Sequence, residues 1–456
     1  MDAALLAQTL ARRATWRARD RWTAQRLRDH QQRALRDLRR RAYARSPFYR
    51  RHHAGLLTAP LHELPPVTKA ELMEAFDEAV TVPGLRLADV ENRLRALTEG
   101  ARDPGRPWRT RWWVAATSGT TGRRGVFIWD RAEWATVLAS YARANDWAGL
   151  PVGVRHPMRM AVVSSLVPSH QSAAVGASLA SALVPTLRID ATAPLLGTVT
   201  ALNDFGPRLL VGYASALREL AAEQRAGRLH IAPEAVLSAS EVLSPAVAGE
   251  LAKAWGRGPF DVYAATETAG IASPCQLRGR HLYEDLVVCE VVDDAGSPVA
   301  AGTTGARLLV TVLFARTLPL IRYEMTDRVS LAPGVCPCGR PFRLLGAVEG
   351  RRADILVLPG RDGTVRIHPN VLHGVLDDVA VAGWQVVQES AGLRVLVTAP
   401  TRLDTPGLST RLRLALESAG AAAVPLDVRQ VHVLPRTALG KTPLVRALPE
   451  GDESTS

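Results

Sequence analysis

Hydroxyl side chains and glycines are concentrated in one stretch, residues 117–122, which reads Thr-Ser-Gly-Thr-Thr-Gly. Glycine allows positive φ and close backbone approach, so successive N–H groups can form an anion-binding concavity to which Ser and Thr hydroxyls add donors. This chemistry suits the oxygens of a nucleoside triphosphate. The Walker pattern is absent, which argues against an ordinary P-loop NTPase. The alternative is a polar surface turn between the apolar runs Trp112–Ala116 and Val126–Trp129.

Four further motifs follow in order along the chain: Tyr263–Glu267, Ile321–Asp327, Gly350–Asp354 and Pro435–Lys441. The first follows a strand-like segment and sets an aromatic ring, a hydroxyl and a carboxylate within five residues. With residues 117–122, and in this order and spacing, the motifs resemble those of the adenylate-forming superfamily of acyl-CoA synthetases. More narrowly, the chain resembles the phenylacetate–CoA ligase-like branch of that superfamily.

The resemblance spans nearly the whole chain, because four more segments look like parts of that branch: Arg45–Arg50, Leu64–Lys69, His281–Asp285 and Cys336–Arg340. It implies an α/β fold, with a large N-terminal adenylate-forming domain built on mixed β-sheets flanked by helices and a small, mobile α+β C-terminal lid. The expected divisions are an Arg-rich helical lead-in (1–60), a nucleotide- and acyl-binding domain (61–349), the lid (350–448) and a disordered tail (449–456). A length of 456 residues, 47% of them hydrophobic, agrees with two or more domains.

The activity implied by the resemblance is that of an AMP-forming acid–thiol ligase. A carboxylic acid, of aryl or arylacetic type, attacks ATP to give an acyl-adenylate and pyrophosphate, and the acyl group then passes to the thiol of coenzyme A. Positioning and charge neutralisation supply most of the catalysis in such a reaction. ATP, Mg²⁺ and coenzyme A are therefore the expected ligands.

The resemblance also implies nucleotide contacts. The β- and γ-phosphates are expected on the loop residues Ser118, Gly119, Thr120, Thr121 and Gly122. Tyr263 is expected against adenine, and Asp327 is expected to accept hydrogen bonds from the ribose, with a further contact from Arg351. Taken singly, Tyr263 could equally fill a core and Asp327 could equally cap a turn or helix.

Three residues carry the catalytic roles that the resemblance implies. Thr266 contacts the α-phosphate, and Glu267 binds Mg²⁺, a hard cation suited to carboxylate oxygen. Lys441 closes on the reacting centre and stabilises the pentavalent transition state. Only three of the 56 basic residues are lysines, and a compact ammonium reaches several oxygens more readily than the planar fork of Arg. A solvated turn carboxylate and an exposed lysine are the structural alternatives.

Specificity for the acid is expected in two segments, Val162–Ala177 and Ser238–Glu241. The candidate pocket residues are Ser164, His170, Ser238, Ser240 and Ala264. Ala264 stands where the family has glycine, which adds a methyl group to the pocket and favours an unusual acid. The first segment lacks the aromatic, Gly-rich character of typical phenylacetate ligases, and a lone His in such a loop is also common for structural reasons.

Two further departures from the family pattern concern the phosphate loop and the hinge. Gly125 occupies a position that is often basic in the wider superfamily, although Arg123 and Arg124 lie beside it. Ala353 occupies the hinge position where the family commonly has Asp, next to the retained Asp354. The first departure does not exclude activity, and the second makes lid rotation and the thioester step less certain.

The four cysteines are Cys275, Cys289, Cys336 and Cys338. A disulfide framework is not expected in a long cytosolic chain. Cys275, Cys336 and Cys338 together with His281 form a plausible tetrahedral set for structural Zn²⁺, and free reduced thiols are the alternative. Cys289 falls within the strand-like segment Leu286–Val292 and is expected in the core.

The net charge of +12 is a local feature, because residues 1–50 hold 14 Arg and 4 Asp, a net +10. Residues Ala3–Tyr43 read as one helix whose Arg-rich face is either solvated or in contact with acidic partners. Aromatic and basic residues do not interleave as in nucleic-acid motifs, so nucleic acid is not an expected partner. No membrane span or secretion signal is apparent, which predicts a cytoplasmic enzyme, and homodimerisation is a family-level expectation.

Two other functions remain open at this stage. The chain could adenylate an acid and deliver its acyl or adenylyl group to a carrier-protein thiol, an amine or a deazaflavin cofactor. It could also be a non-catalytic binding relic, which Gly125 and Ala353 make conceivable and which Glu267, Asp327 and Lys441 argue against.

Overall fold

The computed structural model describes residues 3–100, 103–117, 124–150, 156–179, 181, 183–351, 354–361, 363–367, 369–376, 379, 381, 383–399, 401–437 and 442–448. For residues 351, 370, 373 and 374 only the backbone is described. Several sequence predictions therefore lie outside the described residues, namely those on Ser118–Gly122, Ala353, Lys441 and the 449–456 tail.

The N-terminal segment forms two helices rather than the single predicted one. α1 (Ala3–Arg19) and α2 (Ala24–Arg45) are separated at residues 20–23, where the Thr23 side chain caps α2 by accepting a 3.2 Å hydrogen bond from Arg26 N. This cap lets the chain turn and lay α1 along α7. The short helices α3 (Pro47–His52), η1 (Leu61–Glu63), α4 (Lys69–Glu74) and α5 (Phe76–Ala79) follow, and then α6 (Leu87–Thr98).

The basic residues of α1 are not merely solvated. Arg13 and Arg17 form ion pairs with Asp146, and Arg19 pairs with the fully buried Asp285, which also pairs with Arg143. The guanidinium of Arg143 holds the pKa of Asp285 below its ordinary value despite its burial. Part of the N-terminal charge therefore fastens the helix to the body of the protein.

The main body is built on a seven-stranded sheet in the order β4-β3-β5-β6-β7-β8-β9. The first five strands of this order are parallel, whereas β8 and β9 run antiparallel to their neighbours. Its strands are β3 (Met160–Ser164), β4 (Thr186–Asp190), β5 (Leu209–Gly212), β6 (Ala235–Ala239), β7 (Phe260–Ala265), β8 (Ala269–Pro274) and β9 (Arg280–Leu282). The associated helices are α7 (Arg131–Trp147), α8 (Gln171–Leu179), α9 (Leu195–Phe205), α10 (Ala214–Arg225) and α11 (Pro245–Trp255).

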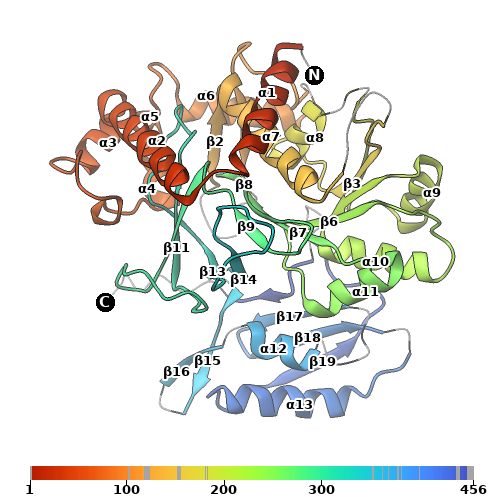
Figure 1. Cartoon of the computed structure of the whole chain (residues 1–456). Helices are drawn as coiled ribbons and strands as arrows, with labels where there is room; N and C mark the ends of the chain where they lie inside the picture. The colour runs from red at the N-terminus through yellow and green to blue at the C-terminus, as the bar shows by residue number, and fades with distance from the viewer. Residues whose placement is uncertain are drawn as a thin grey trace.

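Smaller sheets complete the main body (Figure 1). The two apolar runs beside residues 117–122 form an antiparallel hairpin, β1 (Trp113–Ala116) and β2 (Val126–Trp129). Strands β10 (Val287–Val292), β11 (Arg307–Val312) and β12 (Tyr323–Met325) make one sheet, and β13 (Asp327–Leu331) and β14 (Leu345–Arg351) make another. As predicted, Cys289 is buried within β10.

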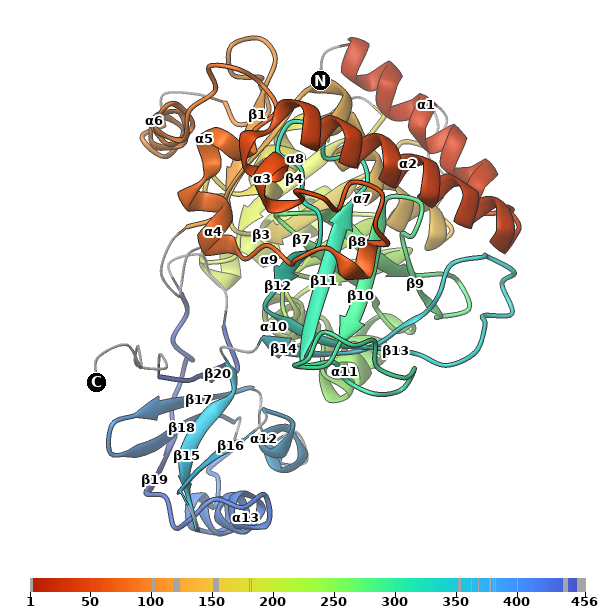
Figure 2. The ribbon, with the colours of Figure 1, turned by 90° about the vertical axis from the view of Figure 1, so that its left-hand side faces the viewer.

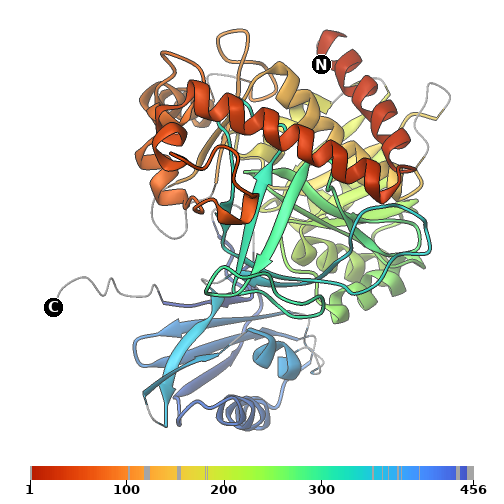
Figure 3. The same ribbon diagram turned by 60° about the vertical axis from the view of Figure 1, so that its left-hand side comes forward.

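The C-terminal elements pack around their own hydrophobic cluster, which includes Trp384, Leu356 and Leu412. The elements are β15 (Leu356–Gly360), β16 (Gly363–Ile367), α12 (Pro369–Leu376), β17 (Gly383–Glu389), β18 (Gly392–Thr398), α13 (Thr405–Ser418), β19 (Leu426–Gln430) and β20 (Val445–Arg446). Their main sheet has the order β19-β18-β17-β20. In all three views this group projects from the main body on the side opposite α1 and α2 (Figures 2 and 3). The predicted α/β class, with mixed sheets flanked by helices, is confirmed.

Candidate active site

The turn between β7 and β8 carries two of the predicted catalytic residues, Thr266 and Glu267. Both side chains are half-buried, and the turn is irregular because Ala269, a non-glycine residue, has φ of 61°. Burial raises the pKa of Tyr323, and the negative charge of the Glu267 carboxylate raises it further. The turn therefore presents a hydroxyl and a carboxylate close together at the edge of the main sheet.

Tyr263 and Asp327, predicted for adenine and ribose, meet in the structure. The Tyr263 hydroxyl donates a 2.9 Å hydrogen bond to Asp327 Oδ2, and the tyrosine is only 9% exposed. Burial, reinforced by the Asp327 carboxylate, raises the pKa of Tyr263 well above its ordinary value, so the phenol stays a donor at neutral pH. The backbone of Arg351 on β14 lies opposite Asp327 on β13, so all three predicted positions converge.

The base of the 117–122 segment is fixed although most of that segment lies outside the described residues. Thr117 N donates to Gly125 O, and Gly125 N donates to Thr117 Oγ1, both at 2.9 Å. These two bonds extend the β1–β2 hairpin and hold residues 117 and 125 side by side. Ala116 N donates to Ser169 O at 2.8 Å, which places the hairpin next to the segment that precedes α8.

Gln171, the first residue of α8, connects this region to the turn that carries Thr266 and Glu267. Its Nε2 donates a 3.0 Å hydrogen bond to the carbonyl oxygen of Thr266, while its Oε1 accepts one of 2.7 Å from the Tyr141 hydroxyl. Gln171 is 3% exposed, so these bonds are shielded from water. Sequence reasoning missed it, because nothing in its local pattern marks a contact with a turn 95 residues away.

Lys69 is a second residue that sequence reasoning missed. A Cβ built on Gly125 would lie 3.4 Å from Lys69 Cδ, so the lysine stem occupies the space beside the base of the loop. Helix α4 is held there because Val126 N contacts the sulfur of Met73 at 3.2 Å. A lysine in the first turn of a helix opposes the helix dipole, so its placement has no benefit for α4 itself. The stem of Lys69 therefore lies beside Gly125, a position that carries no charge of its own.

The predicted pocket residues lie on one edge of the main sheet. Ser164 and Ser238 are near the carboxyl ends of the parallel strands β3 and β6, and Ala264 is on β7. Ligands of such sheets commonly bind outside the carboxyl ends of the strands. Ser238 is fully buried and, among the described residues, its hydroxyl has no hydrogen-bond partner. Ser240 is exposed with φ of 69°, whereas His170 is half-buried and directly precedes α8.

The predicted metal ligands Cys275, His281, Cys336 and Cys338 converge, with their ligand atoms all within 4.8 Å of one another. The Sγ atoms of Cys275 and Cys336 are 3.7 Å apart, and Cys338 Sγ lies 3.1 Å from His281 Nε2. His281 Nδ1 is 3.1 Å from the carbonyl oxygen of Phe342, an outer contact that orients the ring and leaves Nε2 facing the sulfurs. Three sulfurs and one imidazole fit tetrahedral Zn²⁺.

This cluster is separate from the catalytic turn. Cys275 follows the far end of β8, and the six residues of that strand span roughly 20 Å at about 3.3 Å per residue. Any metal held there would stabilise the loops around it rather than meet a substrate at the turn.

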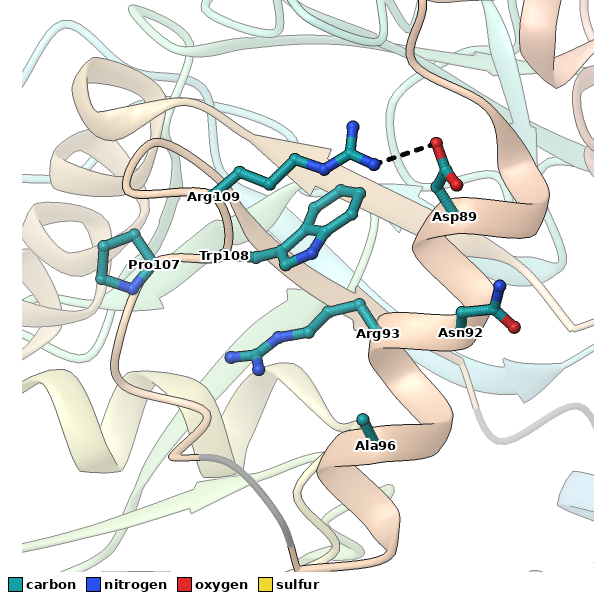
Figure 4. Close-up of a pocket in the computed structure, with 7 residues that line it drawn as sticks. All are labelled: Asp89, Asn92, Arg93, Ala96, Pro107, Trp108 and Arg109. Carbon is teal, nitrogen blue, oxygen red and sulfur yellow. Dashed lines mark hydrogen bonds and ion pairs between the residues drawn. The ribbon is translucent and has the colours of Figure 1, made fainter.

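A surface pocket of about 460 Å³ lies elsewhere, between α6 and the turn at residues 107–109 (Figure 4). Arg109 lies over the ring of Trp108 at 4.4 Å and forms an ion pair with Asp89. None of the lining residues belongs to the predicted site.

In the parts of the chain that the structure describes, no helix has the length and apolar character needed to cross a membrane.

The C-terminal elements contact the main body near the carboxyl ends of the parallel strands of the main sheet. Arg436 forms an ion pair with Glu219 on α10 and donates to the carbonyl oxygen of Ala191. Arg218, also on α10, donates to the carbonyl oxygen of Val381. Lys441 itself lies outside the described residues, but residues on both sides of it, 437 and 442, are described.

Solved structures with a similar fold include 2-hydroxyisobutyryl-CoA ligase. The chain aligns with 2-hydroxyisobutyryl-CoA ligase in the postadenylation state with 2-HIB-AMP over 95% of its own length and 91% of that chain, at TM-score 0.73 and 20% identity. The same ligase in the thioesterification state, with 2-HIB-AMP and CoA, gives TM-score 0.60 at 21% identity, over 94% and 92% of the two chains. At these identities the likeness concerns the fold.

Among curated proteins, the chain is similar to phenylacetate-coenzyme A ligases. The enzyme of Thermus thermophilus is 30% identical over 207 residues, 42% of this chain and 45% of that protein. The enzyme of Escherichia coli K12 is 28% identical over 277 residues, 57% of this chain and 58% of that protein. The chain spans about half the length of the curated relatives it matches. No family model matches the chain. The resemblance that the motifs predicted is confirmed.

Proposed function

We propose that the protein is an AMP-forming ligase that activates a carboxylic acid with ATP and transfers the acyl group to coenzyme A. The observation that carries the proposal is the convergence of the Tyr263–Asp327 pair with the Thr266–Glu267 turn. The link from that turn to the base of the 117–122 segment, through α8, supports the same arrangement. Similarity to phenylacetate-coenzyme A ligases supports the reaction class.

In this proposal the Tyr263 ring lies against adenine while its hydroxyl orients Asp327, so that the carboxylate can accept hydrogen bonds from the ribose. Arg351, whose backbone lies opposite Asp327, adds a ribose contact. The hydroxyls and backbone N–H groups of residues 118–122 bind the β- and γ-phosphates. The Lys69 ammonium adds the positive charge that Gly125 does not supply.

The chemical step requires the acid carboxylate to attack the α-phosphorus while pyrophosphate leaves. Thr266 contacts the α-phosphate from a turn that Gln171 holds in place, which limits the motion of the reacting groups. Glu267 is the residue that would hold Mg²⁺, a hard cation that neutralises phosphate charge when bound. Lys441 stabilises the charge that develops on the pentavalent phosphorus.

The acid is proposed to be of aryl or arylacetic type and to bind at the carboxyl ends of β3, β6 and β7. Ser164, His170, Ser238, Ser240 and Ala264 are the proposed pocket residues. The methyl group of Ala264 favours a smaller or differently shaped acid than a glycine at this position would.

Residues 350–448 are proposed to be the lid, which is hinged near residues 351–354 and rotates between the two half-reactions. The TM-score is higher to the postadenylation state of 2-hydroxyisobutyryl-CoA ligase than to its thioesterification state, which supports a postadenylation-type arrangement of this structure. The divisions 1–60 and 61–349, a cytoplasmic location, homodimerisation and the absence of a nucleic-acid partner stay predictions.

Cys275, His281, Cys336 and Cys338 are proposed to hold a structural Zn²⁺. Their donor set and separations support this assignment, and the ion would fasten the loop after β8 to the loop at residues 336–338.

The proposed function is tested by acid-dependent ATP–pyrophosphate exchange over a panel of aryl, arylacetic, heteroaryl and short aliphatic acids. Exchange that requires one class of acid supports adenylation and identifies the substrate class. AMP release that requires CoA supports thioester formation, whereas exchange without any CoA-dependent release indicates a carrier-protein, amine or cofactor acceptor. Folded protein without exchange on any acid would contradict the proposal.

A further inference from the structure

Pro435 and Pro443, which stand on either side of Lys441 in the sequence, are both bonded to one side chain of the C-terminal elements. Gln385, a fully buried residue of β17, donates from Nε2 to the carbonyl oxygens of Pro435 at 3.3 Å and Pro443 at 2.8 Å. Both bonds lie within the C-terminal elements, so a rigid-body movement of these elements need not break them. They do not decide where Pro435 and Pro443 lie on the main body.

A separate contact attaches Thr442 to the main body. Thr442, the residue after Lys441, is 7% exposed, and its backbone N–H donates a 3.0 Å hydrogen bond to Glu241 Oε1. The other oxygen of the same carboxylate, Oε2, accepts a 2.9 Å hydrogen bond from Ser215 N in the first turn of α10. One carboxylate thus bridges a helix of the main body and the residue beside Lys441.

The surroundings of Glu241 stabilise a negatively charged side chain at this position. The N-terminus of α10 offers unpaired N–H groups and the positive end of a helix dipole, which fix and stabilise the charge. The residue before it, Ser240, has φ of 69°, a left-handed backbone conformation that non-glycine residues rarely adopt. The fold therefore sustains a strained backbone immediately before the side chain that reaches the lid.

We propose that Glu241 is a positioning residue for adenylation: it latches the backbone of Thr442 to α10 and so holds Lys441 at the reacting centre. The inference rests on the proposed function, in which Lys441 stabilises the charge that develops during adenylation. Rotation of the lid for thioester formation must break the Glu241–Thr442 bond and leave the Gln385 bonds intact. The latch therefore favours one half-reaction over the other.

The test compares the two half-reactions in Glu241→Ala. Adenylation is measured as acid-dependent ATP–pyrophosphate exchange, and the second step as conversion of purified acyl-adenylate and CoA to the thioester. Loss of a hydrogen bond to a charged acceptor predicts a fall of about 10- to 100-fold in the ratio of the adenylation rate to the thioester rate, in kcat rather than in KM for the acid.

The matched control is Glu219→Gln, which removes the Arg436 ion pair between the same two parts of the protein without touching Thr442. Because that pair is partly exposed, its loss should change the ratio by less than about threefold. Equal losses in both half-reactions of Glu241→Ala, an effect on KM for the acid or ATP alone, or an unchanged ratio would overturn the latch.

Hydrogen exchange provides a readout that does not require activity. In the wild-type chain the amide of Thr442 should be protected, and Glu241→Ala should raise exchange in the peptide that spans residues 435–448, whereas Glu219→Gln should not raise it at Thr442. Unchanged protection of the Thr442 amide in Glu241→Ala would overturn the latch even if no acid supports ATP–pyrophosphate exchange. An inactive wild-type protein with the expected protection would instead count against the proposed function alone.

Discussion

Replacing Tyr263 with Phe removes the hydroxyl that bonds Asp327 and retains the aromatic ring. The lost bond is 2.9 Å long, almost fully buried and made to a carboxylate, so its removal should cost about 1.5–3 kcal/mol in nucleotide binding. This corresponds to a fall of about 10- to 100-fold in kcat/KM for ATP. Acid-dependent pyrophosphate exchange at varied ATP concentration measures it.

The matched control is Tyr49→Phe, because Tyr49 is also fully buried and donates a 2.7 Å hydrogen bond, in its case to the carbonyl oxygen of Pro319. Tyr49→Phe should lower the free energy of unfolding by about 1 kcal/mol and leave kcat/KM for ATP unchanged. A double-mutant cycle with Asp327→Asn should give coupling between positions 263 and 327. The reasoning is refuted if Tyr263→Phe and Tyr49→Phe have the same kinetic effect.

Three further predictions concern charge, metal and pH. Lys69→Ala should raise KM for ATP about tenfold, whereas Lys69→Arg, which keeps the charge, should raise it less; equal effects of the two variants would contradict this. The purified protein should contain about one zinc per chain by elemental analysis, lost in Cys336→Ala and retained in Cys289→Ala; a metal-free wild type would contradict the site. Burial lowers the pKa of His53 to about 4, so between pH 6.5 and 4 the unfolded chain binds more protons than the folded chain. The free energy of unfolding, measured by denaturant titration, should therefore fall by up to about 2 kcal/mol as the pH is lowered from 6.5 to 4. The same profile should be flatter in His53→Gln.

The sequence predicted those parts of the site that have local signatures. Tyr263, Thr266, Glu267 and Asp327 stand in short motifs at strand ends, where chemistry restricts the residue type. The fold class was predicted from the family resemblance that these motifs carry, and the strand-like segments before Tyr263 and at Leu286–Val292 are strands in the structure. The cysteine and histidine cluster was also predictable, since soft ligands in suitable numbers are rare in such a chain.

The residues that fix these motifs in space could not be predicted in this way. Gln171, Lys69 and Glu241 lie in segments that the sequence singled out, but their contacts are with segments far away in the sequence, which no local pattern shows. The break between α1 and α2 was missed because Thr23 reads as one more residue of an Arg-rich helix until its role as a cap is considered. Such roles depend on which segments lie side by side in the folded chain, and not on the residue type alone.

The measurement that tests the central claim most directly is ATP–pyrophosphate exchange with and without a panel of carboxylic acids, in the wild-type protein and in Lys441→Ala. The account predicts exchange that depends on one class of acid and falls steeply in the variant. Exchange that is independent of acid, or equal in the two proteins, would contradict it.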